Sequence, residues 1–194
     1  NPAEEQPETQ AWEDVQLPFT DVAEDAYYRN AVAWAYSSEP RVTSGISESL
    51  FGPEYDCTRA QAVTFLWNVF GRPEPSASAR RFSDVKEDDY FYKPVLWAAE
   101  MRITSGTSAE NFSPGLVCSN AHILTFIYNA LGKPGHSEAQ EGGEWWEPAF
   151  NWAKSVGLIE GVLSEPFEPE APCPRRNMVE FLFRYHNMKS DKRL

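Results

Sequence analysis

The chain has 194 residues, of which 42% are hydrophobic and 14% aromatic, and its formal net charge at pH 7 is −12. This hydrophobic content argues for a folded globule rather than a disordered chain. The acidic balance argues against general nucleic-acid binding, which needs a basic surface, and no apolar run approaches the roughly 20 residues of a membrane-spanning helix.

The first 17 residues are rich in Pro, Glu and Gln, which predicts an acidic leader or linker. Trp12 and Val15 are its residues with enough apolar surface to dock on a folded unit. The N-terminus lacks the charged and then apolar layout of a secretion signal. We therefore expect the folded part to begin near residue 18.

One ordered set of signals then occurs three times: an aromatic pair, Trp-Ala, a Gly, Phe-x-Pro, and a Cys before an apolar segment. Recurrence at near-constant spacing indicates three copies of one small unit. We call residues 18–75 copy one, residues 76–136 copy two and residues 137–188 copy three, and residues 189–194 form a polar tail. Copy three lacks the Phe-Thr-Asp-Val opening of copy one and starts at Trp145-Trp146.

Each copy is predicted to contain two helices. In copy one, Ala31, Trp34 and Ala35 follow an aromatic pair at i, i+3 and i+4, the spacing of one helix face. This first helix should end between residues 37 and 40. A turn at Gly45 and an irregular loop around Phe51-Gly52-Pro53 come next.

The second helix of copy one begins at Thr58-Arg59-Ala60-Gln61, a sequence that fits a capping box. Gly71 supplies its stop. The segments 58–70, 119–131 and 175–187 show no clear polar face, so each should be buried on most sides. A central three-helix bundle is the economical way to bury all three.

Cys57, Cys118 and Cys173 hold the same position in the three copies. They are 61 and 55 residues apart, without the close Cys and His pairs of zinc sites, so we expect no metal. Each precedes an apolar helix, where a small buried hydrophobe fits. Three core thiols are the first interpretation, and one disulfide is the alternative.

These motifs, in this order and spacing over about residues 18–187, resemble the S-layer homology module in three tandem copies. The resemblance implies an all-α, pseudo-threefold fold with a central three-helix bundle and three helical prongs. It implies a bacterial cell-surface protein that binds secondary cell-wall polysaccharide non-covalently, often through a pyruvylated sugar held in grooves between prongs. No cofactor and no catalysis are expected.

The residues of copy one also suggest an anion site on physical grounds. Arg59 lies in the first turn of a helix, where free N–H groups and the helix dipole favour an anion, and a guanidinium binds a carboxylate through two hydrogen bonds. Gln61 adds neutral donors, and the Ser44-Gly45 turn lets the backbone approach closely. Trp34 or Tyr28 offers a face for a sugar ring, with a core role as the alternative for Trp34 and an ion pair as the alternative for Arg59.

The copies do not keep this site equally. The position of Arg59 is occupied by Asn120 in copy two and by Arg175, followed by Arg176, in copy three. We therefore expect the best site in copy one, a second in copy three, and none in copy two. The alternative function is a degenerate module that serves as a protein-interaction or structural element.

Overall fold

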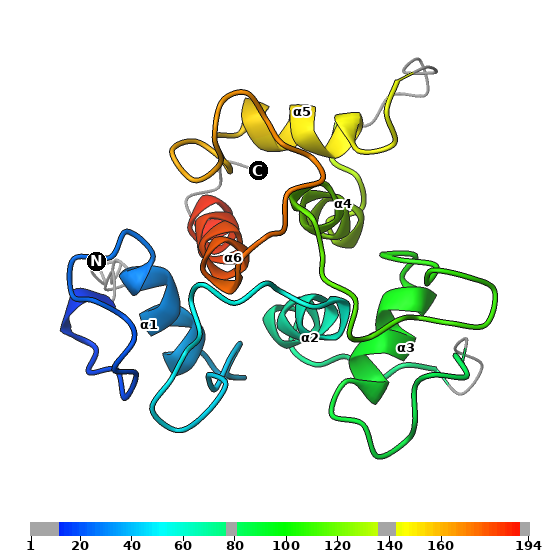
Figure 1. Ribbon diagram of the computed structural model, residues 1–194, viewed down its shortest axis with the longest axis horizontal. Coiled ribbons are helices and arrows are strands. Elements are labelled where there is room, and N and C mark those ends of the chain that lie inside the picture. Colours follow the sequence, from blue (N-terminus) through cyan, green and yellow to red (C-terminus); the bar gives the residue numbers. More distant parts are fainter. Residues whose placement is uncertain (1–11, 77–80, 136–142, 191–194) are drawn as a thin grey trace, which may run out of the picture.

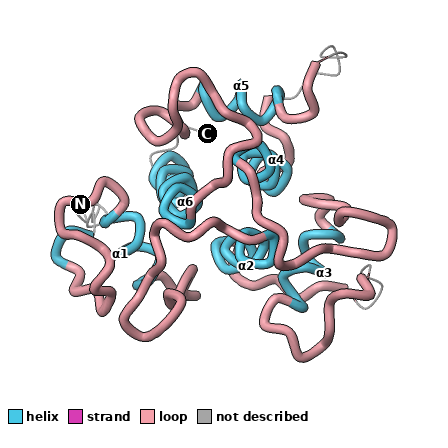
Figure 2. Tube along the Cα trace, in the orientation of Figure 1, coloured by secondary structure: helices cyan, strands magenta, loops and turns pink. Residues whose placement is uncertain are grey.

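The computed structural model describes residues 12–76, 81–135 and 143–190 (Figure 1). Within these ranges the chain forms helices and loops and no strand (Figure 2), which confirms the all-α prediction. A 3-10 turn, η1, spans Trp12–Asp14. The α-helices are α1 Arg29–Ser37, α2 Arg59–Val69, α3 Tyr92–Glu100, α4 Asn120–Ala130, α5 Glu147–Ser155 and α6 Arg175–Ser190.

Helices α2, α4 and α6 stand around the centre of the molecule, and α1, α3 and α5 lie outside them (Figure 1). The central helices fall within the predicted segments, and α6 runs three residues further. Thr58 and Gln61 form the predicted capping box at the start of α2. Gly71 takes a left-handed φ of 81° just after that helix ends, as expected of a glycine stop.

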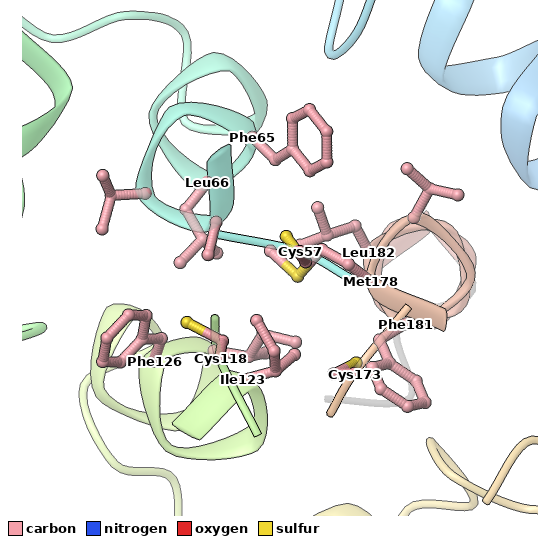
Figure 3. Packing of buried hydrophobic residues seen from close by; sticks show 14 of the residues in the cluster. Cys57, Phe65, Leu66, Cys118, Ile123, Phe126, Cys173, Met178, Phe181 and Leu182 are labelled. Carbon is pink, nitrogen blue, oxygen red and sulfur yellow. The ribbon is translucent and has the colours of Figure 1, made fainter. Parts of the chain in front are cut away.

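A closed ring of three backbone hydrogen bonds joins the three cysteines at the centre of the fold, where their side chains lie among other buried residues (Figure 3). The N–H of Cys57 donates to the carbonyl of Cys173, that of Cys173 to Cys118, and that of Cys118 to Cys57, each at 2.9 Å. All three side chains are fully buried and their thiols are free. The core-thiol interpretation is therefore confirmed, and the equivalent positions meet at one point.

Each central helix starts beneath the loop of another copy. The N–H of Arg59 donates to the carbonyl of Leu116 and that of Ala60 to Pro114. The corresponding bonds run from Asn120 and Ala121 to copy three, and from Arg175 and Arg176 to copy one. The N-terminal N–H groups of these helices would otherwise be orphaned, so these bonds lock the copies together.

The outer helices pack across copies as well. Helix α3 lies on α2, α5 on α4, and α1 on α6, so each outer helix covers the central helix of another copy. At the last of these contacts the ring centroid of Trp34 lies 5.8 Å from that of Phe183 and 5.2 Å from that of His186. The first outer helix, α1, thus packs on the last central helix, α6, and joins copy one to copy three.

Part of the predicted leader is docked. Arg29, at the start of α1, is 7% exposed and donates through its guanidinium to the carbonyls of Trp12 and Val15. The Trp12 ring also contacts Phe183 edge-on at 6.4 Å. Residues 12–15 therefore belong to the folded body, whereas residues 1–11 of the predicted leader, and residues 191–194 of the predicted tail, lie outside the described residues.

The burial of the cysteines predicts their reactivity. Burial raises the pKa of Cys118 to about 12 and that of Cys57 well above its usual value, so the thiolate is scarce at neutral pH. We expect no fast reaction with a thiol reagent in the native protein and three reactive groups after unfolding without reductant. Titration with a chromogenic disulfide measures both, and a count of one after unfolding would reveal a disulfide.

Candidate functional site

The turn at Ser44-Gly45 is held by the opening residues of its own copy. Gly45 has φ 84°, and a Cβ there would lie 2.5 Å from both the Leu50 carbonyl oxygen and the Phe19 ring. The carboxylate of Asp21 accepts hydrogen bonds from the N–H groups of residues 51 and 52, both at 2.8 Å. The loop that follows the turn is therefore rigid on the side facing copy three.

Arg59 contacts the loop of copy two rather than the turn of its own copy. Its Nε donates to the carbonyl of Phe112 at 2.9 Å and its Nη2 to Thr104 Oγ1 at 3.0 Å. The guanidinium also lies 4.8 Å from the centroid of the Phe112 ring and 5.3 Å from that of Phe126. With 4% of the residue exposed, Arg59 links copies one and two from inside the core.

Arg175 makes the equivalent link from copy three to copy one. Its Nε donates to the carbonyl of Phe51 at 3.1 Å, and its guanidinium lies 5.0 and 5.2 Å from the ring centroids of Phe51 and Phe65. The residue is 2% exposed. Unlike Arg59, Arg175 leaves Nη2 without a hydrogen-bond partner within the described residues.

The expected set of Arg59, Gln61 and the Ser44-Gly45 turn is therefore not joined by contacts of Arg59. The guanidinium that reaches the loop after this turn belongs to Arg175 in copy three. Burial lowers the pKa of the Arg175 guanidinium, and the thiol of Cys57 is the largest opposing influence. Sequence spacing assigned the arginine to its own copy, whereas packing assigns it to another.

The N-terminal N–H groups of α2 are also not free for an anion. Two donate to the loop of copy two, and the third, from Gln61, donates to the capping hydroxyl of Thr58 at 3.4 Å. The expectation that free helix-end donors attract an anion fails here because the fold uses them to join its copies.

Of the predicted stacking residues, Trp34 belongs to the core with 3% exposed, so it cannot stack on a sugar while α1 and α6 stay together. Tyr28 is half-buried, and its ring meets that of Tyr27 edge-on at 5.1 Å. Tyr27 itself is 52% exposed. Tyr28 is in helical phase with the buried Val32 and Ala35, a signal that identifies Tyr27 as the outward residue of the pair.

The first aromatic residue of each pair is exposed, and in two of the pairs it contacts the third residue of a central helix from another copy. The Tyr27 hydroxyl donates to Oδ1 of Asn177 at 2.7 Å, and the centroid of the Trp145 ring lies 5.0 Å from that of His122. Tyr90 and Gln61 hold the corresponding positions. We call the pair Tyr90 and Gln61 the first junction. Trp145 and His122 form the second junction, and Tyr27 and Asn177 form the third.

The junctions differ in charge. At the third, Arg176 forms an ion pair with the exposed Glu54, close to Tyr27. At the second, burial lowers the pKa of His122, and the positive charge of Arg59 lowers it further. At the first, partial burial raises the pKa of Tyr90, and the charge of Arg175 opposes that rise. The predicted residues Arg175 and Arg176 therefore lie at different junctions.

The described residues offer neither a metal site nor a membrane-spanning helix. Among residues 12–76, 81–135 and 143–190, no cluster of three or more His, Cys, Asp or Glu side chains is arranged to hold a metal ion. Within the same ranges, no helix combines the length and the apolar character that a membrane span requires.

Comparison with known proteins agrees with the sequence motifs. The model of the S-layer homology domain matches residues 18–63 and 81–119 of this chain. These segments lie in copies one and two, so the third repeat stays a prediction.

The chain is also similar to three curated proteins. A cell surface protein of Thermoanaerobacter kivui is 31% identical over 149 residues, which make up 75% of this chain and 18% of that protein. A cellulosome-anchoring protein of Acetivibrio thermocellus is 26% identical over 152 residues, 72% of this chain and 34% of that protein. A surface-layer 125 kDa protein of Lysinibacillus sphaericus is 24% identical over 148 residues, which make up 71% of this chain and 12% of that protein. The chain thus spans about a third or less of each.

The buried guanidinium predicts a stability effect. Arg59→Ala removes two charge-assisted hydrogen bonds and leaves the Phe112 carbonyl and Thr104 hydroxyl unpaired. We expect a loss of at least about 2 kcal/mol in the free energy of unfolding, where the helix-end anion model predicts almost none. Urea unfolding followed by circular dichroism measures it. Asn129→Ala, which removes a single neutral bond to the Ile103 carbonyl, should cost less.

The close packing around Gly45 predicts a second effect on the free energy of unfolding. Gly45→Ala places a methyl group against Leu50 and Phe19, whereas a Cβ at Gly71, with a similar φ of 81°, meets nothing within 4 Å. Both variants carry the cost of a left-handed alanine, about 1 kcal/mol. We expect Gly45→Ala to destabilise the protein by at least about 2 kcal/mol more, and equal midpoints in urea would refute the close contact.

Proposed function

We propose that this chain is a non-catalytic module that anchors its parent protein to the bacterial cell surface by binding cell-wall polysaccharide through the three junctions. The single observation that carries the proposal is the exposed aromatic residue before each outer helix, Tyr90, Trp145 and Tyr27, two of which contact a polar residue of a central helix. The two S-layer homology segments and the surface-protein relatives support the location. The cellulosome-anchoring relative supports an anchoring role.

The first junction is the best candidate for an anionic sugar. Tyr90 is 65% exposed, which leaves its ring open to a sugar face. Gln61 lies one helical turn before Phe65, the ring over which the Arg175 guanidinium sits. Because Nη2 of Arg175 has no partner, a carboxylate that reaches it through a small shift of the side chain gains a charge-assisted hydrogen bond.

The other junctions offer less to an anion. The second junction has Arg59, but both its Nε and its Nη2 are already used. At the third junction Asn120 stands in place of arginine, and Glu54 brings a negative charge. We therefore propose one strong site and two weaker ones, with the strong site built from Gln61, the Ser44-Gly45 turn, Tyr90 and Arg175.

A protein-interaction role is the second candidate. It is favoured by the burial of Arg59 and Arg175, whose guanidinium groups bond to the protein itself. Under this alternative the junctions are purely structural, and the wall polymer does not bind.

Substitutions at the exposed aromatics separate the two candidates. We expect Tyr90→Ala to weaken binding of isolated wall polymer roughly tenfold or more, because a desolvated aromatic contact contributes about 1.5 kcal/mol or more. Trp145→Ala and Tyr27→Ala should each weaken it less. Met101→Ala is the control, since Met101 is 54% exposed and follows the last residue of α3, at the opposite end of that helix from Tyr90.

Calorimetric titration of the polymer into each protein measures these affinities. Methyl esterification of the polymer's carboxylates should remove most binding to the wild type if the sugar is anionic. Equal affinity for both polymers would contradict the anionic sugar while keeping the anchor. Absence of binding by the wild type would favour the interaction module.

A further inference from the structure

Copies one and two each seat a phenylalanine in the same slot beside the outer helix. The Phe19 ring centroid lies 5.3 Å from that of Tyr36 and 6.0 Å from that of Phe51. In copy two, Phe82 lies 5.7 Å from Phe112. Both phenylalanines are nearly buried, with 5% and 3% exposed, and the two loop rings they cover are fully buried.

The same opening residues also bond to the loop backbone. The N–H of Thr20 donates to the carbonyl of Ser49 at 2.9 Å, and the Asp21 carboxylate accepts the N–H groups of residues 51 and 52. Copy two repeats this pattern, with Ser83 donating to Glu110 and Asp84 accepting two N–H groups at 2.8 and 2.7 Å. The Phe-x-Asp motif is therefore recognised by a ring slot, one carbonyl and two N–H donors.

Copy three has the slot but not the motif. By the repeat spacing, Ser137, Glu138 and Ala139 stand where copy two has Phe82, Ser83 and Asp84. A cavity of about 380 Å³ lies beside α5 and is lined by Phe150, Lys154, Ile159, Glu160, Gly161, Leu163, Ser164, Glu165 and Phe167.

This cavity is the counterpart of the phenylalanine slot, and no described residue fills it. A Cβ on Gly45 or Gly106 would lie 2.5 or 2.6 Å from the opening phenylalanine, whereas a Cβ on Gly161 would meet no described residue within 4 Å. Phe167, the counterpart of Phe51, is only half-buried, and Phe150 stacks on one side of it at 4.3 Å.

The backbone donors of copy three are free as well. Within the described ranges, the N–H groups of Phe167 and Glu168 donate no hydrogen bond, although their counterparts in the other copies bind an aspartate. The carbonyl of Glu165 corresponds to those of Ser49 and Glu110. A cavity lined in part by Phe150, Leu163 and Phe167, with two adjacent free donors, suits an aromatic side chain followed closely by a carboxylate.

We propose that the cavity beside α5 is a socket for an extended polypeptide segment of sequence Phe-Ser/Thr-Asp from a partner protein. The phenylalanine enters the cavity, the middle N–H donates to the Glu165 carbonyl, and the aspartate accepts the N–H groups of Phe167 and Glu168. This assignment is independent of carbohydrate binding at the junctions, because the socket shares no residue with them.

The probe is a peptide of this chain's own residues 17–23, Leu-Pro-Phe-Thr-Asp-Val-Ala. We expect saturable binding to the full chain with a dissociation constant at or below about 1 mM. The amide resonances of Phe167 and Glu168 should shift in ¹⁵N-correlated NMR spectra. Peptides with Phe19→Ala or Asp21→Asn should bind roughly tenfold more weakly or worse. No saturation, shifts that spare both amides, or equal binding of the altered peptides would overturn the proposal.

A graft in the chain provides the matched control. The double substitution Ser137→Phe and Ala139→Asp restores the motif in the register of copy two. We expect it to abolish peptide binding and to raise the melting temperature by at least about 2 °C. A graft that leaves both the melting temperature and the peptide affinity unchanged would also overturn the proposal.

Discussion

The fold depends on the ring of hydrogen bonds among Cys57, Cys118 and Cys173. Buried N–H and carbonyl groups must be paired, and here each copy supplies one donor and one acceptor to two different neighbours. The ring closes only when all three copies are present, so we infer that the chain folds as one cooperative unit. A small apolar side chain fits this crowded centre, which explains the cysteine better than redox or metal chemistry does.

Much of this architecture is predictable because its signals are local. Helix periodicity, the Thr58 capping box and the Gly71 stop involve residues a few positions apart, and the structure has each of them as expected. The loop that covers the start of each central helix is not predictable in this way, because it belongs to another copy. Repeat spacing defines what belongs to a copy, but it does not tell which copy's loop covers Arg59, so it predicts a contact with the Ser44-Gly45 turn that the side chain does not make.

Contacts between copies also decide which arginine at the candidate site is fully paired within the protein. Arg59 and Arg175 occupy equivalent positions and both bridge copies, yet only Arg59 finds a hydroxyl for Nη2. Thr43 and its counterpart Thr104 each accept the N–H of the glycine two residues on, but Thr43 receives no bond from Arg175 Nη2 within the described residues. A buried donor left unpaired costs stability, and such a cost is tolerable where a ligand later satisfies the donor. Small differences between equivalent positions of the copies therefore mark the junction that has an unpaired donor for a ligand.

Copy three shows the opposite case, in which the informative signal is a missing residue. It keeps the elements that hold the fold together, namely the cysteine of the ring, the central helix α6 and the outer helix α5 on α4. What it lacks is the opening motif, which in the other copies braces the loop around Phe51 or Phe112. Because ring closure does not require that brace, its loss changes the surface and spares the bundle. Recognition can therefore diverge at the loops of this fold while the buried centre stays the same.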